Sequence, residues 1–124
     1  MAELNSKYIL LEHGPKVWID LLWSFLFLFF LLKELVINSK SSISLQKHNY
    51  RSERWTIISG RPKITINRNK FFKKPNETAF IPKGAVHRIE NPFKIPVQIV
   101  EVQTGPILRE TDIIRYKDIY GRVN

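Results

Sequence analysis

The sequence contains no cysteine, which removes several classes of protein from consideration. Disulfide-stapled scaffolds, thiolate zinc sites and cysteine nucleophiles all need that side chain. The lack of cysteine also fits a reducing compartment, and we expect the protein to be cytoplasmic. Acidic residues are scarce as well, because 11 aspartates and glutamates stand against 20 lysines and arginines. The resulting net charge of +9 favours anionic partners.

Phosphorylated metabolites, nucleic acid and anionic lipid are the anionic partners to consider. The sequence has no zinc-finger spacing and no aromatic-rich RNA-binding motif, so we do not expect nucleic acid. With 124 residues, the chain can bury one hydrophobic core but not two.

One long hydrophobic run covers residues 17–32. Its uncharged part, residues 21–32, is shorter than the roughly 17–25 residues that a helix needs to cross a bilayer. Asp20 and Lys33 bracket this part. We therefore interpret the run as strands or a helix of the protein core, within an atypical N-terminal segment of residues 1–32. Membrane association through this run is the less favoured alternative.

From Lys33 onward, short apolar runs alternate with Gly, Pro and Asn residues. Residues 63–67 alternate between polar and apolar side chains, and residues 96–103 form the longest run of this kind. β-branched and aromatic residues fill these runs. The pattern predicts an antiparallel sandwich or barrel.

The end of the chain breaks this pattern. In residues 111–121, apolar side chains are spaced three and four positions apart, which is typical of a helix. Thr111 or Asp112 would cap its start and Gly121 would end it. We therefore predict a short C-terminal helix.

Two stretches carry residues that can do chemistry. Residues 44–55 read SLQKHNYRSERW and contain His48 and Glu53, and residues 80–92 read FIPKGAVHRIENP and contain His87. Imidazole and carboxylate groups bind divalent metals and transfer protons. Because side chains alternate along a strand, Glu53 and Trp55 should share one face while Arg54 takes the other.

These two stretches, followed by IVEVQTG at residues 99–105 and DIIRYKDIYGR at 112–122, resemble the cupin domain of type II mannose-6-phosphate isomerases. That domain often forms the C-terminal half of a bifunctional mannose-1-phosphate guanylyltransferase. The resemblance covers about residues 33–122, and the preceding segment departs from the family pattern. It implies that residues 33–124 form an all-β jelly-roll barrel, also called a double-stranded β-helix.

The same resemblance implies interconversion of mannose 6-phosphate and fructose 6-phosphate, which feeds GDP-mannose and polysaccharide biosynthesis. The chain is too short for a guanylyltransferase domain, so we do not expect guanylyl transfer from it. We also expect a homodimer, since cupins often pair through their sheets. The rival interpretation is a noncatalytic or degenerate cupin that binds a sugar phosphate.

The family's first motif reads roughly His-X-His-Arg-X-Glu-His-Trp, and the resemblance implies a divalent metal, zinc or similar. His48 and Glu53 match two of its ligands, and His87 matches the ligand of the second motif. Tyr50 stands where another ligand histidine would be, and a neutral phenol is a poor ligand. Arg54 replaces the histidine before the tryptophan, so the activity is an open question.

For catalysis, we expect Glu53 or His87 to transfer the proton, whichever does not hold metal, with Arg51 beside them. Arginine suits phosphate oxygens because its planar fork donates two parallel hydrogen bonds. The predicted substrate-binding residues are Arg51, Arg88, Lys83, Arg115 and Arg122. The alternatives are that these residues are surface charges and that Glu53 forms a structural ion pair with Arg51 or Arg88.

Overall fold

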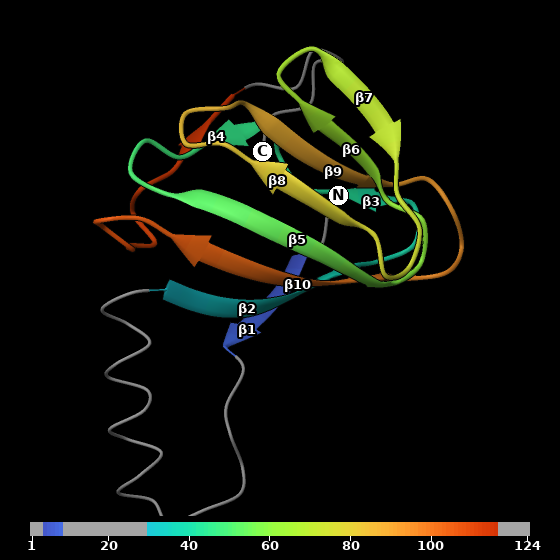
Figure 1. The fold of residues 1–124 in the computed structure, drawn as a ribbon. Coiled ribbons are helices and arrows are strands. Elements are labelled where there is room, and N and C mark those ends of the chain that lie inside the picture. Colours follow the sequence, from blue (N-terminus) through green and yellow to red (C-terminus); the bar gives the residue numbers. More distant parts are fainter. Residues whose placement is uncertain (1–3, 9–29, 117–124) are drawn as a thin grey trace, which may run out of the picture.

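A computed structural model describes residues 4–8 and 30–116, and every regular element in these ranges is a strand (Figure 1). One antiparallel sheet has five strands. In spatial order they are β1 (Leu4–Tyr8), β2 (Phe30–Ile37), β10 (Val97–Thr104), β5 (Ser52–Ser59) and β8 (Thr78–Ile81).

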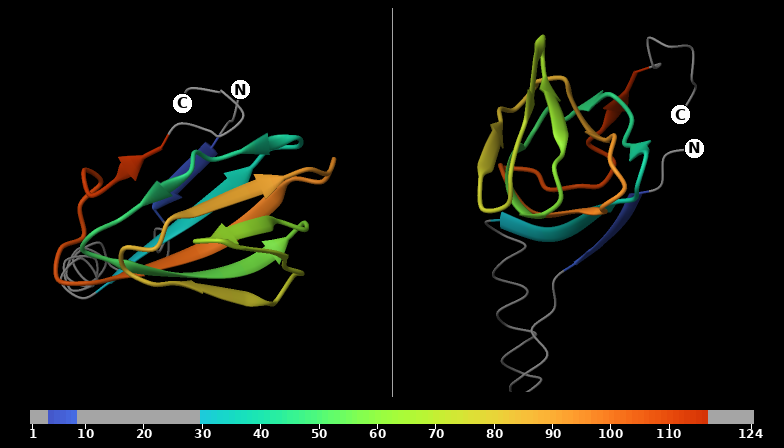
Figure 2. Two further views of the ribbon diagram at one scale, coloured as in Figure 1. Left: turned by 90° about the horizontal axis from the view of Figure 1, so that it is seen from above. Right: turned by 90° about the vertical axis from the view of Figure 1, so that its right-hand side faces the viewer.

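The second sheet faces the first and is built from shorter strands. In spatial order they are β11 (Ile114–Arg115), β4 (Gln46–Lys47), β9 (His87–Asn91), β6 (Lys63–Ile66) and β7 (Asn69–Phe72), while β3 (Ser41–Ser42) also pairs with β9. The chain crosses repeatedly between the sheets, so each sheet combines distant parts of the sequence. Seen from the side, the two layers enclose a common interior (Figure 2). The predicted antiparallel barrel is therefore confirmed.

The hydrophobic core follows from the alternation of side chains along the strands. In β2, every second residue is buried, and β10 and β5 show the same alternation over most of their length. Apolar residues fill the inward positions of one half of the barrel, with Ile37, Ile57 and Ile99 fully buried. Burying a side chain of this size stabilises the fold by about 1.5–3 kcal/mol.

Towards the other end, the same strands place polar residues inside. The pairing aligns Leu35 of β2 with Ile99 of β10, but two residues away it aligns Lys33 with Glu101. The next inward position of β10, Gln103, pairs with Glu53 of β5. The interior thus changes from apolar to polar along the barrel, and the polar end is where a site can form.

The predicted helix over residues 111–121 is wrong where the structure describes it. The Asp112 carboxylate does not cap a helix, because it accepts hydrogen bonds from the backbone N–H groups of Asn49 (2.8 Å) and Tyr50 (3.0 Å). Ile114 and Arg115 then form β11 against β4. Long-range pairing has overridden the local helical pattern, and residues 117–124 lie outside the described part.

Most of the hydrophobic run at residues 17–32 also lies outside the described residues. Its last three residues begin β2, where Leu31 is buried. Among the residues that the structure describes, no helix is long and apolar enough to cross a membrane.

Candidate functional site

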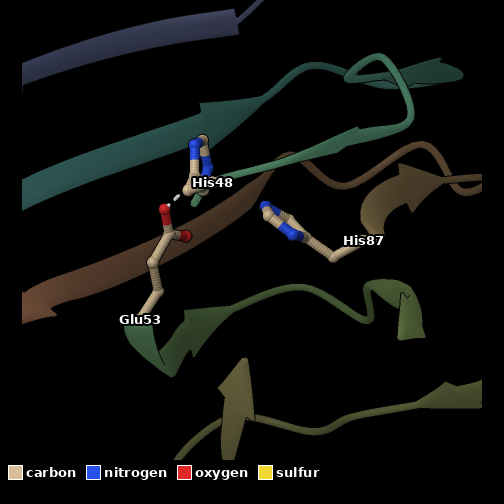
Figure 3. A group of neighbouring side chains, drawn as sticks. All are labelled: His48, Glu53 and His87. Carbon is tan, nitrogen blue, oxygen red and sulfur yellow. Dashed lines mark ion pairs between the residues drawn. The ribbon is translucent and has the colours of Figure 1, made fainter. Parts of the chain in front are cut away.

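Three of the predicted site residues converge at the polar end of the barrel (Figure 3). His48 lies just after β4, Glu53 lies in β5 and His87 begins β9. One ligand atom from each lies within 4.8 Å of the other two. All three side chains are buried, with exposed fractions of 3%, 2% and 0%. Segments that are far apart in the sequence therefore bring two imidazoles and a carboxylate to one point.

Backbone carbonyl groups orient both imidazole rings. His48 Nδ1 lies 2.6 Å from the Asp112 carbonyl oxygen, and His87 Nδ1 lies 3.0 Å from that of Ala85. Since a carbonyl oxygen only accepts, each Nδ1 must donate, and Nε2 of the neutral ring keeps its lone pair. Metal-binding histidines are commonly fixed in this way. Both rings are thus prepared to bind a cation through Nε2.

The His87 ring carries the clearest sign of an additional ligand. Its Nε2 atom is buried and has no hydrogen-bond partner among the described residues. Buried polar atoms in folded proteins almost always have a partner. Burial also lowers the pKa of His87 below its ordinary value of 6.5, which favours the neutral form that binds metal. The donor set of two imidazoles and a carboxylate fits a divalent cation such as zinc.

Arg51 also contacts two of the candidate ligand atoms. Its Nε donates to Glu53 Oε1 at 3.1 Å, and its Nη2 lies 3.2 Å from His48 Nε2. His48 Nε2 itself lies 2.9 Å from Glu53 Oε1. The predicted alternative for Glu53, an ion pair with Arg51, is therefore present in the structure. Because neutral His48 Nε2 has one lone pair, it can accept from Arg51 or bind a metal, but not both.

A second carboxyl group, that of Glu101, lies beside Glu53. Trp55 Nε1 donates to both, at 3.0 Å from Glu53 Oε2 and 3.0 Å from Glu101 Oε1. Gln103 Nε2 donates to Glu101 Oε2 at 2.7 Å. Glu101 and Gln103 were not among the residues predicted from the sequence. They lie two and four residues after Ile99 in the longest predicted strand. Side-chain alternation along this strand would have placed them on the same inward face as Ile99.

The environments of the two carboxyl groups move their pKa values apart. Burial, together with the negative charge of Glu53, raises the pKa of Glu101 well above 4.5. Burial alone would also raise the pKa of Glu53, but two contacts outweigh it and hold that pKa well below its usual range. They are a hydrogen bond with Glu101 and the contact with His48 Nε2, which is a hydrogen bond when the ring carries a second proton. The two carboxyl groups therefore carry one proton between them, which resides on Glu101 while Glu53 is ionised.

A cavity of about 200 Å³ opens beside this cluster. Basic side chains from three separate parts of the chain line it, together with His48 and Glu53. These basic residues are Lys33, Arg51 and Arg115. Arg51 and Arg115 were among the predicted substrate-binding residues, whereas Lys33 was not.

The other predicted residues lie elsewhere. Arg88 is on the opposite face of β9 from His87 and donates to Ser42 Oγ at 2.9 Å, and Lys83 is exposed in the turn after β8. Neither lines the cavity, so their positions give no support to a role in substrate binding. Arg122 lies outside the described residues. The prediction that Arg54 faces outward is confirmed, because it is exposed and lies 4.7 Å above the Phe80 ring.

Tyr50 does not join the ligand cluster. Its side chain is 50% exposed, and it lines a different depression together with Arg109 and Asp112. The residue at this position of the motif thus points away from His48 and Glu53, which leaves three candidate ligands.

A protein-family model described as "Mannose-6-phosphate isomerase C-terminal" matches residues 28–118. The chain belongs to this family. Its relatives include the alginate biosynthesis protein AlgA of Pseudomonas putida, which is 42% identical over 95 residues. A mannose-1-phosphate guanylyltransferase of Klebsiella pneumoniae is 41% identical over 93 residues. These matches cover 77% and 75% of this chain but only 20% of each relative, so the chain spans about a fifth of their length.

Solved structures confirm the cupin fold of this family member. A predicted oxalate decarboxylase from Thermotoga maritima superposes with a TM-score of 0.65 at 19% identity, covering 82% of this chain and 80% of that one. A protein from Klebsiella pneumoniae with a double-stranded β-helix domain gives 0.63 at 18% identity, covering 71% and 70%. A cupin-superfamily sugar phosphate isomerase from Silicibacter pomeroyi gives 0.57 at 16% identity, covering 61% and 50%. At such identities the likeness concerns the fold alone.

Proposed function

We propose that this chain binds a divalent metal through His48, Glu53 and His87 and interconverts mannose 6-phosphate and fructose 6-phosphate. The observation that carries the proposal is the convergence of two Nε2 lone pairs and a carboxylate in a chain of this family. A supply of sugar phosphate for GDP-mannose and polysaccharide synthesis, a cytoplasmic location and a homodimer belong to the same proposal.

Aldose–ketose isomerisation moves a proton between two adjacent carbons through an enediol. It requires a group that removes and returns the proton, an electrophile at the carbonyl oxygen, and a cation that holds the phosphate. A bound divalent metal would supply the electrophile. The chain itself must supply the other two groups.

Three residues are candidates for the proton transfer. Glu53 and His87 were predicted from the sequence, but each can take this role only if it does not bind metal, and in the proposed site both of them do. The structure adds Glu101, whose carboxyl group lines the same cavity and shares the Trp55 Nε1 donor with Glu53. A carboxyl group that keeps its proton beside one that has lost it is a common arrangement in acid–base catalysis.

The cavity limits the size of the substrate. Its volume of about 200 Å³ lies below the roughly 300–1,000 Å³ of typical small-molecule pockets, which suits a small polar ligand. Arg51 and Arg115 line it and present guanidinium groups to an anion. A phosphorylated sugar matches both the size and the charge.

The rival function is a cupin that binds a sugar phosphate without catalysis. Two observations favour it: Tyr50 replaces a ligand and points away, and Arg51 already contacts His48 Nε2 and Glu53 Oε1. In this alternative, Arg51 would serve as a permanent counterion for Glu53, and metal would bind weakly or not at all.

Calorimetric titration with Zn²⁺ or Co²⁺ tests the metal site. Glu53→Gln and His87→Leu should each weaken metal binding by at least about tenfold, since even the partners of ligands are worth 10–100-fold. Glu90→Gln is the matched control, because Glu90 lines a separate depression with Lys40 and should leave the affinity unchanged.

A coupled assay on mannose 6-phosphate then separates the two functions. Turnover that is abolished by a chelator and by Glu53→Gln supports the isomerase. Metal binding without turnover would favour the binding protein, and equal metal affinity in all variants would contradict the proposed site. Light scattering of the purified chain tests the homodimer.

A further inference from the structure

Lys33 is the most unusual charged residue of the barrel interior. It occupies an inward position of β2 between Leu31 and Leu35, and only 7% of its surface is exposed. Lysine is rarely buried to this extent, because removing its ammonium group from water is costly unless an anion pairs with it. A lysine at such a position therefore needs an anionic partner.

Glu110, which also lines the cavity, provides this anionic partner. The Lys33 Nζ atom forms an ion pair with Glu110 Oε1, in the segment between β10 and β11. The two side chains differ in environment, since 9% of the Lys33 side chain is exposed but 61% of the Glu110 side chain is. An exposed carboxylate can return to water at little cost to itself, but the buried ammonium group then needs another anion in its place. Glu110 is thus a replaceable partner for Lys33.

The acidic residues deeper in the cavity have other partners. Glu53 accepts from Arg51 and contacts His48, and Glu101 accepts from the Trp55 and Gln103 side chains. Lys33 pairs in register with Glu101, which places it next to this network. The ammonium group and the guanidinium groups of Arg51 and Arg115 then border one cavity of about 200 Å³.

We propose that Lys33 binds the phosphate group of a phosphate monoester. In the absence of this ligand, the Glu110 carboxylate pairs with Lys33, and the phosphate displaces it on binding. Basic groups on β2, on β11 and before β5 would surround the anion from three sides. A compact ammonium charge at the inner wall favours a phosphate monoester with two negative charges over a carboxylate with one. This inference rests on the proposed function in one respect only, which is the identity of the sugar that carries the phosphate.

The test measures binding rather than turnover. Inorganic phosphate, mannose 6-phosphate and mannose are titrated separately into the purified chain and its variants, with binding followed by calorimetry. Lys33→Met should weaken binding of both phosphates by at least about tenfold, the value of a hydrogen bond to a charged group. Lys94→Met is the matched control, because Lys94 is exposed outside the cavity, and it should change the affinity less than about twofold.

The Glu110→Gln variant provides a second, independent test in which Lys33 is unchanged. Removing the competing carboxylate should tighten binding of both phosphates by about threefold to tenfold, since the ligand no longer displaces an ion pair. This arm decides the question if Lys33→Met does not fold. Unchanged or weaker phosphate binding in Glu110→Gln would overturn the inference, as would equal losses in Lys33→Met and Lys94→Met.

The ligands separate this inference from the proposed function. Binding of inorganic phosphate but not of mannose 6-phosphate, with the expected effects of the variants, supports the Lys33 subsite and counts against a sugar phosphate isomerase. If neither phosphate binds to the wild-type chain or to Glu110→Gln, the subsite is rejected, whereas metal binding is tested by its own titration.

Discussion

The two halves of the barrel interior are built from the same strands but contain different chemistry. In β10, Val97 and Ile99 face an apolar core, while Glu101 and Gln103 face a buried polar network. In β5, Ile57 lies in the first half and Glu53 in the second. Strand geometry sends every second residue inward whatever its polarity. Position along the strand therefore decides whether an inward residue stabilises the fold or forms the site.

The charged groups of the polar half depend on their partners in a way that the apolar side chains do not. Apolar contacts are numerous and individually weak, so a single loss leaves the others in place. When a buried charge loses its partner, nothing offsets the free energy needed to remove it from water, and the folded state is destabilised. Single substitutions in the polar half should consequently change both stability and metal affinity, whereas those in the apolar half should change stability alone.

Arg51→Met should have the largest effect on stability. It removes the guanidinium group that pairs with Glu53, and breaking a buried ion pair costs about 3–5 kcal/mol. Chemical denaturation of the metal-free protein measures this loss. The same variant should bind Zn²⁺ more tightly, because His48 Nε2 no longer accepts from Arg51.

Arg54→Met is the matched control for that variant, because Arg54 lies on the outer face of β5 over the Phe80 ring. It should lower stability by only about 0.5–1 kcal/mol and leave Zn²⁺ affinity unchanged. Equal losses in the two variants would mean that the inner network has no special energetic role.

Ile57→Ala tests the apolar half. Ile57 is fully buried, and truncating such a residue lowers the free energy of unfolding by about 2–5 kcal/mol through lost burial and a residual cavity. In the fraction of protein that stays folded, Zn²⁺ affinity should match the wild type. A large loss of metal affinity would show that the two halves are energetically coupled.

Glu101→Gln should alter how stability depends on pH. The folded protein holds the pKa of Glu101 above 4.5, its unfolded value, so unfolding releases a proton once the pH exceeds 4.5. The contribution of Glu101 to the free energy of unfolding of the wild type therefore decreases as the pH rises from 4.5 towards the pKa of the folded state. Glutamine does not titrate, and rotation of the Gln103 amide lets it accept from the new side chain.

Denaturation of both proteins without metal at a series of pH values measures this effect. Relative to the wild type, Glu101→Gln should gain stability between pH 4.5 and pH 8, with the smallest difference near pH 4. A constant difference across this range would show that Glu101 titrates normally.

Tyr50→His should have the smallest effect. It restores the residue that the family motif has at this position, but the side chain is half-exposed and lines another depression. Titration with Zn²⁺ should show a change of less than about twofold, because the loop would have to rearrange before a histidine could reach the cluster. A large gain in affinity would show that this rearrangement occurs readily.

The features of the fold and of the site that depend on local patterns and on motifs could be predicted from the sequence. Alternation and turn residues predicted the barrel, and the resemblance selected His48, Glu53 and His87, which the structure brings together. The helix at residues 111–121 failed because an antiparallel pairing with β4 competes with local helical preference. Lys33 was not among the predicted residues because in the sequence it only ends a hydrophobic run, whereas its inward position in β2 follows from the register with β10.

Asp112 links the last described segment to the first motif, since its carbonyl group orients the His48 ring and its carboxylate holds the backbone at residues 49 and 50. Any recombinant version of this domain that stops soon after β10 would keep most of the sandwich but release the ring. Such a shortened protein should look folded by circular dichroism but lack the ring orientation that the proposed metal site requires. The boundary chosen when the domain is cloned or fused to another protein thus becomes a determinant of its chemistry.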